Sequence, residues 1–248
     1  MTRVSVCIAT HNGGIFLEKQ LHSILDQLSE NDEVIISDDS STDDTIKIIK
    51  AINDPRIVLI EHQEFYCAAK NFEHALKNAH GQYIFFSDQD DYWLSNKVSL
   101  MLEKLQTYDI VVCDAKIIDK DDKVVHESYF NLRNSGKGWV KNLLRNTYIG
   151  CCMAFHRKVL KEALPFPNLI FYHDYWIGYI GELYYSTYFL PIALTHYRQH
   201  DKNVSTAALN ISNRNMLEKL KDRVVLLCYL PLLYYRYFYG KQSAPALE

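Results

Sequence analysis

Three carboxylates, Asp88, Asp90 and Asp91, stand within four residues, directly after an apolar run at residues 83–86. Like charges at this spacing repel one another, and each raises the pKa of its neighbours unless a cation lies among them. Hard divalent cations such as Mg²⁺ and Mn²⁺ prefer carboxylate and water ligands and bridge phosphate oxygens. A solvated turn is the alternative, because aspartate is common in turns. The segment therefore predicts either a metal site for a phosphate-bearing ligand or a plain turn.

The elements around these carboxylates alternate between short apolar runs and helical patterns. This alternation is typical of an α/β fold with a parallel, doubly wound sheet. Ligands bind such sheets outside the carboxyl ends of the strands. The polar loops at 10–14, 38–44 and 88–91 each follow a strand, so we expect them to meet at one crevice. The predicted strands are 4–9, 33–37, 57–60 and the run before Asp88, and the predicted helices are 15–28 and 68–79.

The second half of the chain is less regular. Residues 119–139 are polar and rich in turn formers, which predicts a loop or hairpin over the site. Gly150 lies inside an apolar run, a place where the backbone often approaches another group closely. The other predicted elements are helices 95–106 and 171–183 and strands 110–113, 147–155 and 194–200.

Length and composition exclude several classes of protein. The 248 residues, 48% hydrophobic and 23% charged, suit one large α/β domain or one and a half ordinary domains. A net charge of −3 argues against nucleic acid as a partner. The six cysteines form no C-x-x-C pair, so we expect free thiols in a reducing cytosol and no secretory signal. Dinucleotide-binding and P-loop motifs are absent from the sequence.

The segments Ile8-Ala9-Thr10-His11-Asn12-Gly13, Asp38-Asp39-Ser40-Ser41-Thr42-Asp43, Gly81-Gln82-Tyr83-Ile84 and Ser87-Asp88-Gln89-Asp90-Asp91 carry a resemblance. In this order they resemble the family 2 inverting glycosyltransferases of the GT-A fold, over roughly residues 3–205. The resemblance implies a Rossmann-like α/β domain with a mixed, mainly parallel sheet flanked by helices. It places the catalytic domain at 1–205, with a nucleotide-binding half of about 1–115 and an acceptor-side half of about 116–205. A C-terminal helical extension follows at 206–246.

The resemblance implies which residues bind a nucleoside diphosphate sugar. Ala9, His11 and Asp39 stand where the family contacts the nucleobase and ribose, and Asp88 would face the ribose. Lys70 falls where relatives carry a basic residue near the nucleotide, although a solvated helix position explains it equally well.

Two residues of this sequence differ from those that the family usually has. His11 stands where many relatives have tyrosine, and Cys67 stands where glycine is common, which leaves nucleobase stacking and the local loop shape open. Asp38 is predicted to bind the backbone of its own loop in an Asx-type turn or helix cap.

The predicted metal ligands come from two distant segments. Asp90 would bind Mn²⁺ or Mg²⁺ between the two phosphates, and His200 resembles the C-terminal histidine ligand of GT-A enzymes. His196 competes with His200 for that role, and a structural histidine is the alternative for both. Arg198 is predicted to bind the diphosphate, or else to pair with a carboxylate such as Asp174.

Asp174 stands where the family places its catalytic carboxylate. It would accept the proton of the acceptor hydroxyl while the acceptor oxygen attacks the anomeric carbon from the opposite face. The alternative is that Asp174 only caps the following helix. His173 is predicted to orient Asp174 or to contact the acceptor, and Gly150 matches the glycine beside the sugar site.

The combination of Ser-Asp-Gln-Asp-Asp, His-Asp-Tyr-Trp and Tyr-Arg-Gln-His resembles bacterial enzymes of O-antigen or capsule synthesis, including rhamnosyltransferases. It implies metal-dependent transfer from a UDP- or dTDP-sugar, with dTDP-rhamnose as one candidate, to a glycan or lipid-linked glycan. One alternative is a sugar-1-phosphate nucleotidyltransferase, which would want a basic glycine-rich loop after the first strand. Another is a non-catalytic subunit that binds nucleotide sugars. Such a subunit would not need the carboxylate of Asp174.

The apolar run at 224–235 is twelve residues long, too short to span a bilayer. Arg223 and Arg236 flank it, so one hypothesis is a peripheral membrane contact through 213–240. The alternative is a helix packed on the catalytic domain or on a second subunit of a homodimer. We accordingly expect a cytoplasmic protein, with the inner face of the plasma membrane as a second location. Leu247 and Glu248 have the appearance of a cloning remnant.

Overall fold

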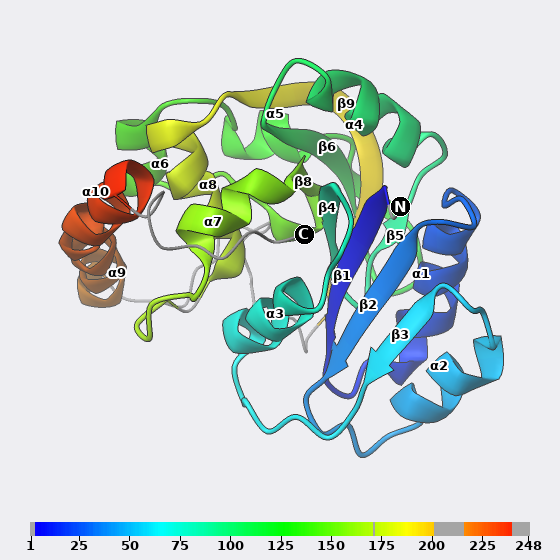
Figure 1. The fold of residues 1–248 in the computed structure, drawn as a ribbon. Helices are drawn as coiled ribbons and strands as arrows, with labels where there is room; N and C mark the ends of the chain where they lie inside the picture. Colours follow the sequence, from blue (N-terminus) through cyan, green and yellow to red (C-terminus); the bar gives the residue numbers. More distant parts are fainter. Residues whose placement is uncertain (1–2, 171, 201–215, 240–248) are drawn as a thin grey trace.

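The structure is a computed structural model that describes residues 3–170, 172–200 and 216–239. Its strands form one nine-stranded sheet in the order β3-β2-β1-β4-β8-β6-β9-β5, with β7 paired to β6 (Figure 1). The strands are β1 Val4–Thr10, β2 Glu33–Asp38, β3 Ile57–Ile60, β4 Tyr83–Ser87, β5 Tyr92–Trp93, β6 Ile110–Ile118, β7 Val124–His126, β8 Met153–His156 and β9 Thr187–Arg198.

The first four long strands are parallel, as predicted. β1 lies between β2 and β4, with Cys7 level with Ile35 on one side and Phe86 on the other. Helices α1 and α2 pack together on one side of this half of the sheet, and α3 lies on the other (Figure 1). Because both faces are covered, the strands are nearly continuous apolar runs. The helices are α1 Gly14–Leu25, α2 Thr45–Ile52, α3 Ala68–Lys77, α4 Lys97–Leu105, α5 Tyr129–Arg133, α6 Trp139–Leu144, α7 Leu160–Ala163 and α8 His173–Tyr184.

The other half of the sheet is mixed. β8 runs antiparallel to both β4 and β6, whereas β6 and β9 are parallel. The mixed sheet that the GT-A resemblance implies is confirmed, and a purely parallel doubly wound sheet is wrong for this half. An apolar run indicates that a strand is buried, but it does not indicate whether the strand runs parallel or antiparallel to its neighbour. An antiparallel pair, unlike a parallel one, does not need a crossover helix that the sequence would show.

Several local predictions change in this half. The strand predicted at 110–113 continues to Ile118, and the strand predicted at 194–200 begins at Thr187 and ends at Arg198. Residues 147–155 are not one strand: a 3-10 turn, Gly150–Cys152, interrupts the run, and β8 begins only at Met153. Residues 119–139 do form a hairpin, β6 with β7, but they also contain α5. The side chain of Ser128 caps that helix by accepting a hydrogen bond from the Asn131 amide, an Asx/ST-type signal at a helix start.

Two C-terminal helices, α9 Met216–Cys228 and α10 Leu230–Tyr239, pack near α6 and α7 (Figure 1). Leu226 and Leu233 are their buried contacts with the core. Arg223 donates to the backbone carbonyls of α6, and Arg236 donates to those of α7. None of the described helices is both long enough and apolar enough to cross a membrane. The predicted start of the extension, at 206, lies outside the described residues.

Candidate active site

The loops after β1, β2 and β4 meet at the carboxyl edge of the sheet. The His11 amide donates to Gln89 Oε1 at 2.9 Å, and Gln89 Nε2 donates to the His11 carbonyl at 3.1 Å. The Asp39 amide donates to the Thr10 carbonyl at 2.9 Å, which joins the second loop to the first. The three loops predicted to line the crevice therefore meet at one edge of the sheet, and they hold one another in place.

The predicted nucleotide side of this crevice is built on Asp39. Its backbone carbonyl lies 2.6 Å from His11 Nδ1, and its Oδ1 accepts a hydrogen bond from the Phe65 amide at 2.6 Å. The neighbouring Asp38 has the loop role that we expected, because its Oδ1 accepts from the Ser41 amide at 2.8 Å. Ala9, one residue before the end of β1, is half-buried.

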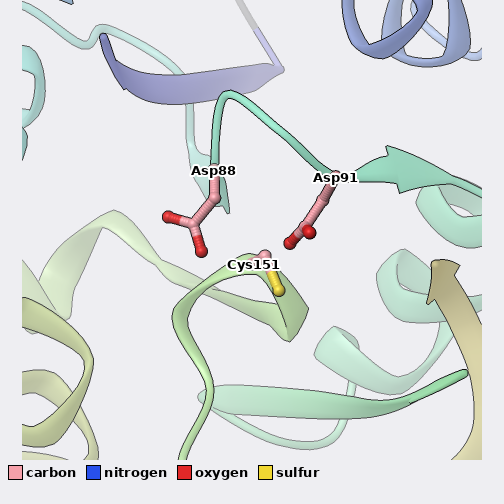
Figure 2. A group of neighbouring side chains, drawn as sticks. All are labelled: Asp88, Asp91 and Cys151. Carbon is pink, nitrogen blue, oxygen red and sulfur yellow. The ribbon is translucent and has the colours of Figure 1, made fainter. Parts of the chain in front are cut away.

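The acidic loop after β4 directs two carboxylates at a buried thiol. Ligand atoms of Asp88, Asp91 and Cys151 all lie within 4.8 Å of one another (Figure 2). Burial, followed by the charges of Asp90 and Asp174, raises the pKa of Asp88 to about 8. Burial and the charges of Asp90 and Asp88 likewise raise the pKa of Asp91. Burial and repulsion between these carboxyl groups therefore favour the protonated forms of Asp88 and Asp91.

Asp91 is the most buried of the three carboxylates, with 1% of its surface exposed. Its Oδ1 accepts a hydrogen bond from the Arg198 amide at 2.7 Å. Its buried Oδ2 receives none from any N–H or O–H group of the described residues. The Cys151 thiol beside Asp91 lowers the pKa of Asp91 through a side-chain hydrogen bond, against the larger raising effect of burial.

The predicted metal ligands Asp90 and His200 lie side by side. His200 Nε2 is 2.9 Å from Asp90 Oδ2, and the His200 ring stacks on Phe16 with its centroid 5.3 Å away. The competing histidine, His196, contacts the Tyr92 hydroxyl instead. Carboxylate oxygen with imidazole nitrogen suits Mn²⁺, and a carboxylate-rich surrounding suits Mg²⁺ as well. These residues fit a divalent cation.

The predicted base, Asp174, lies in the first turn of α8 and is half-buried. Its Oδ1 accepts a hydrogen bond from the Tyr175 amide at 2.7 Å. Burial raises its pKa to about 6, against the lowering effect of backbone hydrogen bonds from Tyr175, from Asp174 itself and from Gly150. A carboxylate with a pKa near neutrality can accept a proton and pass it on.

The neighbouring His173 is held between aromatic rings. Its ring stacks on Phe72 at a centroid distance of 3.7 Å and meets Phe86 edge-on at 4.8 Å. Burial lowers the pKa of His173 to about 3, so the imidazole is neutral at physiological pH. Its Nε2 has no hydrogen-bond partner among the described residues, and it points at Gly150.

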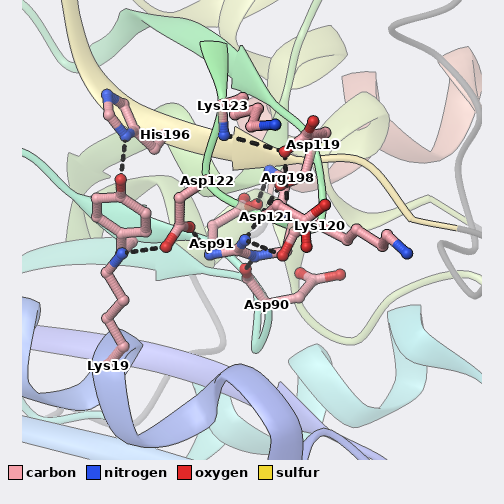
Figure 3. Close-up of polar contacts among 11 residues, drawn as sticks. Lys19, Asp90, Asp91, Asp119, Lys120, Asp121, Asp122, Lys123, His196 and Arg198 are labelled. Atoms are coloured by element: carbon pink, nitrogen blue, oxygen red, sulfur yellow. Dashed lines mark hydrogen bonds and ion pairs between the residues drawn. The ribbon is translucent and has the colours of Figure 1, made fainter. Parts of the chain in front are cut away.

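Two residues predicted to contact the nucleotide sugar, Lys70 and Arg198, have protein partners in this structure. Lys70 Nζ lies 2.9 Å from Glu73 Oε2 and 3.2 Å from the Phe166 carbonyl. Arg198 pairs with a carboxylate, as the alternative held, but with Asp122 at 2.7 Å rather than with Asp174 (Figure 3). Their contacts with a nucleotide stay predictions.

Sequence reasoning missed Lys97, the most buried charge near the site. It is 0% exposed, and its Nζ donates to the Cys151 carbonyl at 2.5 Å and to Thr195 Oγ1 at 2.8 Å. Its charge is the one that lowers the pKa of Asp88. A lysine near the start of a helix usually faces solvent, so the only signal in the sequence for a buried Lys97 was its position shortly after Trp93. In the structure, Lys97 Nζ lies 4.4 Å from the centre of the Trp93 ring.

Comparisons with known proteins fit this geometry. The model of glycosyl transferase family 2 matches residues 5–164. The chain is 30% identical over 237 residues to the UDP-Glc:alpha-D-GlcNAc-diphosphoundecaprenol beta-1,3-glucosyltransferase WfaP of Escherichia coli, covering 92% of each protein. It is 27% identical over 231 residues to the dTDP-rhamnosyl transferase RfbG of Shigella flexneri, covering 86% of this chain and 78% of the relative.

Solved structures share the fold at lower identity. S. aureus TarS 1-349 in complex with UDP-GlcNAc superposes with a TM-score of 0.64 at 17% identity, over 96% of this chain and 73% of the TarS 1-349 chain. The mannosyltransferase PcManGT from Pyrobaculum calidifontis, in complex with GDP-Man and Mn²⁺, gives a TM-score of 0.62 at 20% identity, over 96% and 70% of the two chains. On the family match and the similarity to WfaP, this chain is a glycosyltransferase and belongs to glycosyl transferase family 2.

Proposed function

We propose that this protein transfers a sugar with inversion from a pyrimidine nucleoside diphosphate sugar to a hydroxyl of a lipid-linked glycan, in a metal-dependent reaction. The observation that carries the proposal is the meeting of Asp90 and His200, 2.9 Å apart, at the crevice that also holds Asp88 and Asp174. Asp88 and Asp90 lie in the loop after β4, His200 lies just beyond the end of β9, and Asp174 lies in α8.

The donor side of the site consists of the residues predicted from the sequence. Ala9, His11 and Asp39 would contact the nucleobase and ribose, and Asp88 would contact the ribose. Asp90 and His200 would hold Mn²⁺ or Mg²⁺, which when bound neutralises charge on the departing diphosphate. Similarity to WfaP, whose name gives UDP-Glc as its donor, supports a UDP-hexose ahead of dTDP-rhamnose.

The acceptor side rests on Asp174. Its carboxylate would accept the proton of the acceptor hydroxyl while that oxygen attacks the anomeric carbon from the face opposite the diphosphate. A positioned general base contributes roughly 10²–10⁴-fold to a rate. Burial of the carboxylate raises its basicity, and the neutral His173 beside it adds no positive charge that would lower it. Gly150 would lie beside the sugar, with the His173 imidazole packed against it.

A thermal-shift panel tests the donor. UDP, dTDP, GDP and CDP are each added with Mn²⁺ or with EDTA, and a ligand at about 100 times its Kd should add about 2.7 kcal/mol to the free energy of unfolding. We expect a rise in Tm with UDP that EDTA abolishes. Transfer from UDP-glucose and from dTDP-rhamnose to a GlcNAc-diphospholipid is then measured. No shift with any nucleotide would contradict the proposal and favour a scaffold or degenerate relative that does not bind nucleotide sugars.

We also propose that α9 and α10 bring the site to its lipid-linked acceptor by touching the membrane surface. Large apolar side chains are exposed along both helices, namely Leu217, Leu220, Val224, Leu227, Tyr234, Tyr235, Phe238 and Tyr239, and Lys221 is an exposed charge among them. Arg223 and Arg236 donate to the catalytic domain instead of facing outward. Binding would therefore depend on apolar contact more than on anionic lipid.

Co-sedimentation with neutral and anionic liposomes tests this contact. The double substitution Leu220→Asp with Val224→Asp should move the protein into the soluble fraction, whereas Lys221→Asp serves as the matched charge control on the same helix. If both variants behave like the wild type, the membrane contact is wrong. If the double variant instead changes the sedimentation coefficient in lipid-free solution, the face belongs to a homodimer.

A further inference from the structure

The side chain of Arg198, at the end of β9, is enclosed by three segments that are distant in sequence (Figure 3). Only 2% of the residue is exposed. Its guanidinium group lies 4.3 Å from the centre of the Phe16 ring on α1. On its other sides are the acidic loop after β4 and the turn between β6 and β7. The arginine is therefore part of the wall of the site.

Every nitrogen of this guanidinium group donates to the protein. Nε donates to the Asp90 carbonyl at 2.9 Å, and Nη2 lies 2.7 Å from Asp122 Oδ1. Nη1 donates to the carbonyls of Asp119 and Lys120, at 3.2 and 3.3 Å. A buried guanidinium with satisfied donors would have to break several of these bonds to reach a diphosphate, and each orphaned partner would cost about 1–3 kcal/mol.

The same arginine fixes the acidic loop through its backbone as well. The Arg198 amide donates to Asp91 Oδ1 at 2.7 Å, while Nε holds the Asp90 carbonyl. His200, the partner of Asp90 at 2.9 Å, follows only two residues later. One residue thus sets the position of both sides of the predicted metal site.

We infer that Arg198 is a positioning residue for the Asp90–His200 pair and not a ligand of the diphosphate. It holds the Asp90 loop against the end of β9, and Asp122 in the β6–β7 turn holds the arginine. Asp122 is in turn anchored to α1, since Lys19 Nζ lies 2.8 Å from its Oδ2. This inference rests on the proposed metal-dependent function.

The experiment measures Mn²⁺ binding to the metal-free protein without nucleotide, by electron paramagnetic resonance of free Mn²⁺. Arg198→Gln should weaken Mn²⁺ binding at least tenfold, because Asp90 and His200 lose their fixed separation. Asp122→Asn should weaken it in the same direction by about threefold or more, although Asp122 touches neither predicted ligand. Asp121→Asn is the matched control in the same turn: only its backbone amide has a described hydrogen bond, so Mn²⁺ binding should not change.

UDP binding measured in the presence of EDTA distinguishes a positioning role of Arg198 from a role as a ligand of the diphosphate. A positioning arginine leaves metal-free UDP binding unchanged in both the Arg198→Gln and Asp122→Asn variants. If Arg198→Gln instead weakens metal-free UDP binding while Mn²⁺ binding without nucleotide stays at the wild-type level, the arginine is a diphosphate ligand and the inference is wrong. The Asp122→Asn variant keeps the test decisive if Arg198→Gln does not fold, because Asp122 has a side chain 43% exposed.

Mn²⁺ and UDP binding to the wild-type protein distinguishes a failure of this inference from a failure of the proposed function. If it binds UDP but no Mn²⁺ under any condition, the metal-dependent reaction is contradicted, and Arg198 has no metal pair to position. If it binds Mn²⁺ and the Arg198 and Asp122 variants bind it equally well, the proposed function stands and only the inference is overturned.

Discussion

The Nε2 atom of His173 fills the space that a side chain at Gly150 would need, because a Cβ at Gly150 would lie 2.6 Å from that atom. The 3-10 turn Gly150–Cys152 and the first turn of α8 are therefore in direct contact. The Cβ of Asp174 would be 3.5 Å away from the same added atom. The absence of a side chain at Gly150 thus helps to define where the predicted base stands.

Gly150→Ala should lower kcat for transfer by at least tenfold. The new methyl group must displace His173, which the rings of Phe72 and Phe86 prevent from turning aside, and Asp174 moves with it. The measurement is a double-mutant cycle with His173→Ala, which removes the clashing atom. We expect the double variant to lose less than the sum of the two single losses. Additive losses would mean that the two residues act separately.

Asp174→Asn should abolish transfer and at the same time stabilise the fold at pH 8. The pKa of Asp174 is raised from 3.8 to about 6 in the folded protein, so the folded state favours the protonated form. The stabilising contribution of Asp174 is therefore complete below pH 3.8 and lost as the pH rises through about 6. A shift of this size corresponds to at most about 3 kcal/mol.

Urea unfolding of wild type and Asp174→Asn at pH 5 and pH 8, with EDTA present, measures this effect. The advantage of the variant should shrink as the pH falls through about 6. An asparagine variant that is less stable than the wild type at pH 8 would show that the carboxylate mainly serves the fold, as a helix cap does.

Between pH 5 and 7, below the pKa of about 8 of Asp88, the rate of transfer should rise as the pH passes through about 6. Asp174 must be ionised to accept the proton of the acceptor, and its pKa is about 6. His173, with a pKa of about 3, stays neutral throughout this range and adds no second step. The profile of kcat/KM between pH 5 and 7, at saturating Mn²⁺, checks this. A rate that falls as the pH rises through 6 would exclude Asp174 as the base.

Lys97→Met should destabilise the protein by several kcal/mol. The substitution leaves the Cys151 carbonyl and Thr195 Oγ1 without their buried donor, at about 1–3 kcal/mol each, and it removes the cation beneath Asp88. Lys104→Met, on the outer face of the same helix, is the matched control and should change stability little. Equal effects of the two substitutions in urea unfolding would contradict a special role for Lys97.

The sequence by itself determined the parallel half of the fold and the loops of the crevice. Short apolar runs ending at Thr10, Asp38 and Ser87 are local signals, and parallel strands bring their carboxyl ends to one edge whatever the rest of the chain does. Asp90 and Asp174 could be chosen as site residues because each has a recognisable neighbourhood in the sequence.

Only the tertiary structure decided the contacts that depend on long-range register. Tyr92 is level with His196 in the β5–β9 pair, and this leaves His200, beyond the end of β9, to meet Asp90. In the same way the sequence could not show that Lys97 lies under the acidic loop or that Arg198 binds Asp122. The physical reason is that the partner of a side chain is set by how distant strands align, and no local pattern records that alignment.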